Sequence, residues 1–159
     1  MPRRLPRLAL LAAALVVAGA ALAARLPYDE SADAKSDIRA ALKDAGVARR
    51  PVLLIFGANW CEDCRKLDEA LKTGRNAALV SRDFRIVKID VGRFDRNQDV
   101  VAAYGDPTGH GIPSAVIVSP DNRILFATRA GELADARHMS DDGIHELFAK
   151  AAGIAGAAR

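Results

Sequence analysis

Cysteine is scarce in this 159-residue chain, which contains two cysteines, three histidines and two methionines. The sequence also lacks an internal repeat, a low-complexity tract beyond its first residues, and any nucleotide, flavin or metal motif. Half of the residues are hydrophobic and charges occur throughout, which argues against a disordered chain and against a polytopic membrane protein. The length is typical of one domain. Because the sequence has no nucleotide, flavin or metal motif, we expect no cofactor.

The excess of positive charge, +3 overall, lies at the N-terminus. Three arginines there precede an uncharged apolar run of 17 residues, residues 8–24. A basic start, an apolar middle and an Ala-x-Ala exit predict a secretory signal peptide over residues 1–24, cleaved after Ala23 or Ala24. The alternative is an uncleaved membrane anchor, because a run of this length lies at the lower limit for spanning a bilayer.

The rest of the chain, residues 25–159, is predicted to be a single exported domain. Once the three N-terminal arginines are set aside, it holds 20 basic and 20 acidic side chains. It has no basic arm or stripe, so we expect no nucleic-acid partner. We expect a monomer in the periplasm, or otherwise outside the cytoplasm, that contacts a membrane only if the N-terminal segment stays attached.

Both cysteines lie in one short segment, Trp60-Cys61-Glu62-Asp63-Cys64. A structural disulfide across two residues closes almost no loop, so it would remove little entropy from the unfolded chain. A tetrahedral zinc site would need two more good ligands. Redox chemistry needs only one thiolate to attack a disulfide and a second thiol to release the mixed disulfide. The spacing therefore favours a redox dithiol over a structural disulfide or a metal site.

The flanking sequence predicts alternating helices and strands. Helices are expected over 32–45, 97–104 and 141–152, and strands over 52–56, 85–91, 114–118 and 123–128. A further helix is expected to follow Cys61 and to end by Gly74. Cys61 would then lie at the N-terminus of this helix, where the unpaired backbone N–H groups and the helix dipole stabilise a thiolate. The order of elements implies an α/β fold, a mixed sheet covered on both faces by helices.

Several residues outside the cysteine segment extend the pattern. They are Phe56, Lys88, Asp90, Tyr104-Gly105 and Gly111-Ile112-Pro113-Ser114. Together with Trp-Cys-x-x-Cys, they make the chain from Ser31 onward resemble the thioredoxin superfamily, most closely its exported thiol-disulfide interchange proteins. Trp-Cys-x-x-Cys alone is moderately specific, and a Gly-Ile-Pro-Ser about fifty residues later, before a buried strand, makes the combination strong. The resemblance implies the thioredoxin-like fold.

The resemblance also implies a role for each matched residue. The first cysteine of the family is the exposed nucleophile, which assigns Cys61, and the second resolves the mixed disulfide, which assigns Cys64. The proline after Gly-Ile is cis and packs against the dithiol, which points to Pro113. The residue before it offers backbone hydrogen bonds to a bound peptide, which points to Ile112, with Trp60 in the same peptide-binding region. Without the resemblance, Pro113 would be expected to be an ordinary trans proline at the start of a strand.

The implied activity is that of a thiol-disulfide oxidoreductase. Its partners would be thiols and disulfides of exported proteins and a second redox protein that supplies or takes electrons. The direction of exchange stays open, with a preference for reduction or interchange. Two other functions stay open as well: a non-catalytic peptide-binding module with a structural disulfide, and a copper or zinc carrier.

One departure from the family pattern concerns the proton acceptor of the second cysteine. The family's reductases carry a buried acid six residues before the first cysteine, where this chain has Ile55. Lys88 matches the lysine that partners that acid, and it either takes part in the reaction or extends to solvent. Glu62, Asp63 or water would then have to take the proton.

A second departure lies between the cysteines, where Glu62 and Asp63 bring two negative charges. These charges oppose a Cys61 thiolate, whereas the helix N-terminus favours it. The same carboxylates also suit the first turn of a helix. We therefore expect Cys61 to be less acidic than the reactive thiols of strong oxidants.

The histidines give weaker indications. His110, close to the Gly-Ile-Pro segment, is either a surface residue in a turn or a residue that tunes the first cysteine or contacts substrate. His138 and Met139, together with both cysteines, would suit copper. His145 is expected to be exposed on the last helix.

Overall fold

A computed structural model describes residues 26–157. The predicted signal peptide over residues 1–24 and its cleavage sites lie outside these residues. Within the described part of the chain, no helix is both long and apolar enough to cross a membrane.

Four strands form one mixed sheet in the order β2-β1-β3-β4. They are β1 (Val52–Gly57), β2 (Arg85–Asp90), β3 (Ser114–Val118) and β4 (Ile124–Ala127). The central strand β1 runs parallel to β2 and antiparallel to β3, and β3 is antiparallel to β4. The mixed α/β sheet expected from the sequence is confirmed.

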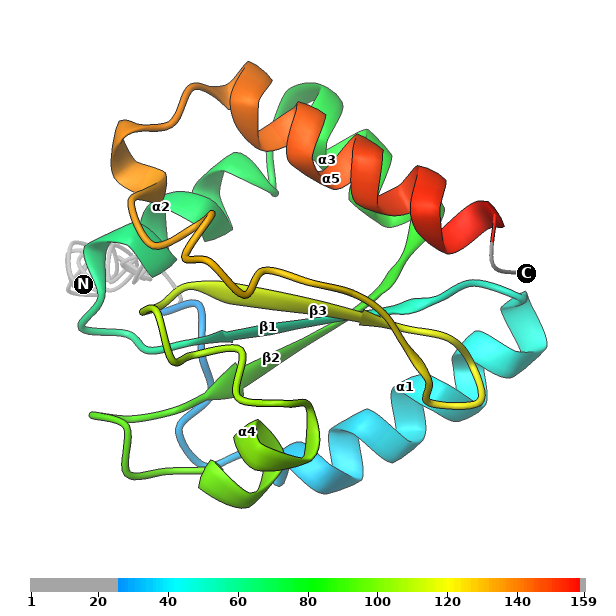
Figure 1. Cartoon of the computed structure of the whole chain (residues 1–159), viewed down its shortest axis with the longest axis horizontal. Helices are drawn as coiled ribbons and strands as arrows, with labels where there is room; N and C mark the ends of the chain where they lie inside the picture. The colour runs from blue at the N-terminus through cyan, green and yellow to red at the C-terminus, as the bar shows by residue number, and fades with distance from the viewer. Residues whose placement is uncertain (1–25, 158–159) are drawn as a thin grey trace, which may run out of the picture.

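Helices cover both faces of this sheet, as Figure 1 shows. They are α1 (Ala34–Ala48), α2 (Glu62–Ala70), α3 (Gly74–Asp83), α4 (Gln98–Ala103) and α5 (Asp141–Ala157), with a short 3-10 turn η1 (Ala136–His138) before α5. Helices α1 and α4 lie on one face, and α2, α3 and α5 lie on the other.

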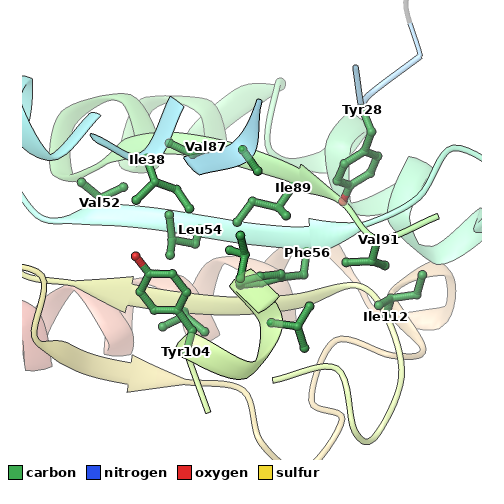
Figure 2. Close-up of a cluster of buried hydrophobic side chains, with 14 of the residues drawn as sticks. Tyr28, Ile38, Val52, Leu54, Phe56, Val87, Ile89, Val91, Tyr104 and Ile112 are labelled. Carbon is green, nitrogen blue, oxygen red and sulfur yellow. The ribbon is translucent and has the colours of Figure 1, made fainter. Parts of the chain in front are cut away.

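The sheet separates two apolar cores because successive side chains of a strand point to opposite faces. Leu54 and Phe56 of β1 pack on the α1 side, where Figure 2 shows them with Val87 and Ile89 of β2. Leu53 and Ile55 pack on the α2 side. Every residue of β1 is buried, as expected for a short, continuous apolar run.

Three segments differ from the sequence-based prediction. The whole of α3 was missed, because only Leu79 and Val80 mark its apolar face. Helix α5 runs five residues beyond the predicted end, since Ala155 is fully buried in the core. Helix α1 continues through Gly46 and ends where Arg49 adopts a left-handed conformation, with φ of 51°. The other strand and helix boundaries that were predicted as residue numbers agree with the structure or differ by no more than two residues, as helix and strand ends commonly do.

The central strand provides a test of the packing. Leu54 is fully buried between Val87 and Val116 of the neighbouring strands. We expect Leu54→Ala to lower the free energy of unfolding by about 2–5 kcal/mol, through lost burial and a residual cavity. Denaturant titration measures this change. Val47→Ala, at a site 86% exposed, should change it by less than about 0.5 kcal/mol.

Candidate active site

The two cysteines lie just beyond the end of β1, at the start of α2. Cys61 is the N-cap of α2: its backbone is extended, and its Sγ accepts a hydrogen bond from the backbone N–H of Cys64 at 3.1 Å. The two sulfurs are joined in a disulfide. The structure therefore shows an oxidised pair in which the first sulfur faces the positive end of a helix dipole.

Both cysteines are largely covered in this oxidised form. Cys61 is 5% exposed and Cys64 is 1% exposed. Cys61 is thus less accessible than the exposed nucleophile that the family resemblance implied, because its sulfur lies against the loop that carries Ile112. It is still the more exposed of the two, and only it stands at the very start of the helix.

That loop carries the cis proline. The Ile112–Pro113 peptide bond is cis, and Ile112 O lies 3.6 Å from Cys61 Sγ. The loop turns at Gly111, whose φ of +108° is unfavourable for any residue with a Cβ. The backbone carbonyl of Ile112 consequently reaches the first sulfur from a position 51 residues away in the sequence.

The two acids between the cysteines share a cationic partner. Arg137 Nη1 donates to Glu62 Oε2 at 3.0 Å, and the backbone N–H of Arg137 donates to Asp63 Oδ1 at 2.9 Å. Arg137 Nε lies 3.8 Å from the same Asp63 oxygen. Arg137 therefore offsets part of the repulsion that the carboxylates exert on a Cys61 thiolate. Sequence reasoning missed it, since nothing local links η1 to α2.

Lys88 is neither free in solvent nor opposite an acid on β1. It faces Ile55 across the β1–β2 pair, and Ile55 is buried in the core on the α2 side. Lys88 Nζ instead forms an ion pair with Asp68 on α2, and Asp68 also binds Lys72 at 2.6 Å. The acid that partners this lysine thus comes from the helix rather than the strand. Its place one helical turn after Cys64 is the sequence signal that could have indicated it.

An aromatic patch borders the cysteines. We use this name for Trp60, Arg93 and Phe94. Trp60 is 47% exposed, its Nε1 donates to Gly92 O at 2.8 Å, and its ring meets that of Phe94 edge-on at 6.5 Å. The Arg93 guanidinium lies 5.5 Å from the Trp60 ring, a cation–π distance. Phe94 has φ of 63°, a rare conformation for a bulky residue.

The histidines contribute little near the disulfide. His110 is exposed. His138 Nδ1 lies 2.6 Å from Asp135 Oδ1, and among residues 26–157 no three histidine, cysteine or acidic side chains converge on a possible metal position. The prediction that His145 is exposed was wrong. The residue is half-buried, with Nδ1 3.1 Å from Asn76 Oδ1, because α5 packs against α3.

A family model described as thioredoxin-like matches residues 33–120 of the chain. The chain belongs to the thioredoxin-like family. This confirms the resemblance to the thioredoxin superfamily and the thioredoxin-like fold that the resemblance implied.

Similar proteins have related names. The crystal structure of a disulphide isomerase from Xylella fastidiosa Temecula1 is similar at a TM-score of 0.79 and 52% identity, over 80% of this chain and 98% of that one. Thiol:disulfide interchange protein TxlA of Synechococcus elongatus is 28% identical over 151 residues, covering 87% of this chain and 76% of TxlA.

A third similarity is more local. Thiol:disulfide interchange protein DsbD of Campylobacter jejuni is 31% identical over 49 residues, which cover 31% of this chain. The matched segment spans only 9% of the length of DsbD.

The contact of Arg137 with both carboxylates leads to a prediction. In the reduced protein, Arg137→Ala should move the midpoint of the Cys61 thiolate titration to higher pH, because the two acids lose their cationic partner. An upward movement of up to about one pH unit is expected, and thiolate absorbance measures it. Arg123→Ala, which breaks the remote pair with Asp121, is the matched control and should leave the midpoint in place.

Proposed function

We propose that this protein is a thiol-disulfide oxidoreductase that exchanges disulfides with exported proteins. The observation that carries the proposal is the Cys61–Cys64 disulfide at the N-terminus of α2, with Ile112 O 3.6 Å from the first sulfur. The names of the similar proteins support the same activity. The predicted signal peptide supports the location of the substrates outside the cytoplasm.

In the reducing direction, the Cys61 thiolate attacks one sulfur of a substrate disulfide. The substrate S–S bond breaks, a Cys61–substrate disulfide forms, and the released substrate thiolate takes a proton from water. The Cys64 thiolate then attacks Cys61 Sγ, which forms the Cys61–Cys64 disulfide and releases the second substrate thiolate. Two electrons pass from the protein to the substrate, and a second redox protein must restore the dithiol.

The two cysteines take different parts because their surroundings differ. Cys61 is the N-cap of α2, where the helix dipole stabilises a thiolate, and Arg137 offsets the nearby carboxylates. Cys64 is 1% exposed and one turn inside the helix, so a folded substrate has no access to it. Cys61 is therefore assigned as the nucleophile and Cys64 as the resolving thiol.

The surface around Cys61 suits an extended polypeptide. The Ile112 carbonyl can accept a backbone hydrogen bond from the substrate, and the aromatic patch offers exposed apolar area beside it. Aromatic and arginine side chains are those most enriched where proteins bind one another. The substrate segment flanking its disulfide would lie across this surface.

Insulin-disulfide reduction tests the activity. We expect the wild type to reduce insulin in the presence of a dithiol, Cys61→Ser to be inactive, and Cys64→Ser to accumulate mixed disulfides with its substrates, since the first thiol attacks but the second cannot release the product. Non-reducing electrophoresis detects these adducts. Activity unchanged in Cys61→Ser would refute the proposal and favour a peptide-binding module.

The aromatic patch yields a separate prediction. Phe94→Ala should lower kcat/KM for a protein disulfide by roughly five- to thirtyfold, through loss of about 1–2 kcal/mol of contact with the polypeptide. Rates with a small disulfide such as cystine should not change, because so small a substrate does not reach the patch. Ile124→Ala, at a similarly exposed apolar side chain on β4, is the control and should affect neither substrate.

A further inference from the structure

A buried tyrosine lies beside the inner cysteine. Tyr28, in the segment before α1, is 4% exposed. Its backbone N–H donates to Asn59 Oδ1 at 2.9 Å, and Asn59 Nδ2 donates back to Tyr28 O at 2.9 Å. These two bonds attach the tyrosine to the turn that carries the cysteines, and Figure 2 shows its hydroxyl directed toward the end of β1.

Gly57, the last residue of β1, brings the tyrosine hydroxyl and the Cys64 sulfur together. A Cβ at this position would lie less than 3.0 Å from both Tyr28 Oη and Cys64 Sγ. The oxygen and the sulfur are therefore separated by less than about 6 Å, twice that limit. Only glycine leaves room for this approach.

The surroundings of Tyr28 keep its hydroxyl protonated. Burial, reinforced by the negative charges of Asp68 and Asp90, raises the pKa of Tyr28 far above its ordinary value of 10. Cations accompany both acids: Lys88 and Lys72 pair with Asp68, and Arg96 pairs with Asp90 at 2.9 Å. A phenol that stays protonated at neutral pH can donate a hydrogen bond while keeping its own proton.

We propose that, once the disulfide opens, the Tyr28 hydroxyl donates a hydrogen bond to the Cys64 sulfur and stabilises the thiolate that resolves the mixed disulfide. This inference rests on the proposed function and names a positioning residue for its second step. Cys64 Sγ is buried, and loss of contact with water disfavours a thiolate there. A hydrogen bond from the Tyr28 hydroxyl lowers the free-energy cost of forming that thiolate. The freed sulfur needs only to turn toward the hydroxyl, or to share one water with it.

The step balances without a protein base. The Cys64 thiol gives its proton to water, its thiolate attacks Cys61 Sγ, and the bond between Cys61 and the substrate breaks. The substrate thiolate leaves and takes a proton from water, while Tyr28 keeps its own proton throughout. A buried acid at the position of Ile55 is then not needed to hold Cys64 in its reactive form.

Tyr28→Phe tests this role, because it removes the hydroxyl and keeps the buried ring. The reduced protein is mixed with 5,5′-dithiobis(2-nitrobenzoate), an aromatic disulfide whose two halves are coloured thiolates. The first coloured thiolate reports attack by Cys61, and the second reports resolution by Cys64. We expect Tyr28→Phe to slow the second phase about five- to tenfold at neutral pH, to move its pH midpoint upward, and to leave the first phase unchanged.

Tyr104→Phe is the matched control. Tyr104 is also buried, but its hydroxyl donates to Asn122 at 2.9 Å rather than approaching the cysteines, so both phases should keep their wild-type rates. An unchanged second phase in Tyr28→Phe, or equal slowing of both phases, would overturn the inference. A wild type that does not reduce insulin would instead overturn the proposed function, so the two failures can be told apart.

Discussion

The N-cap of α2 is the interaction on which the site depends. Cys61 Sγ accepts the N–H of Cys64, which fixes the first sulfur at the helix end and the second one turn along the same helix. Strand β1 carries this junction, and all six of its residues are buried. A one-residue slip in its register would move every side chain of the strand into the opposite core. The geometry of the disulfide is therefore set by the packing of the central strand.

Around this junction, charges are paired across elements distant in sequence. Arg137, just before α5, pairs with the acids between the cysteines, and Asp68 of α2 forms an ion pair with Lys88 of β2. The two residues of each pair lie on different elements and are far apart in the sequence. Arg137 offsets part of the repulsion that the two acids exert on a Cys61 thiolate, and the helix N-terminus acts on the same sulfur.

Predictions from the sequence were correct where a short motif or a clear apolar run marked the segment. The dithiol segment from Trp60 to Cys64 and the buried strand at 114–118 were predicted where the structure has them. The cis bond before Pro113 was predicted from the family resemblance and not from local signals. Helix α3 was missed because two apolar residues give too little periodicity to detect. The prediction that His145 is exposed was wrong because the residue contacts Asn76 of α3.

Residue identity and short-range spacing determined the α/β fold class and the dithiol, whereas the cis proline at Pro113 and the missing acid at Ile55 followed from the resemblance to the thioredoxin superfamily. Only the tertiary structure decided which groups surround the sulfurs. Arg137 of η1 and Tyr28, in the segment before α1, reach the disulfide or its neighbours from parts of the chain that are distant in sequence. Such contacts depend on how helices pack against the sheet, and spacing along the chain does not encode them.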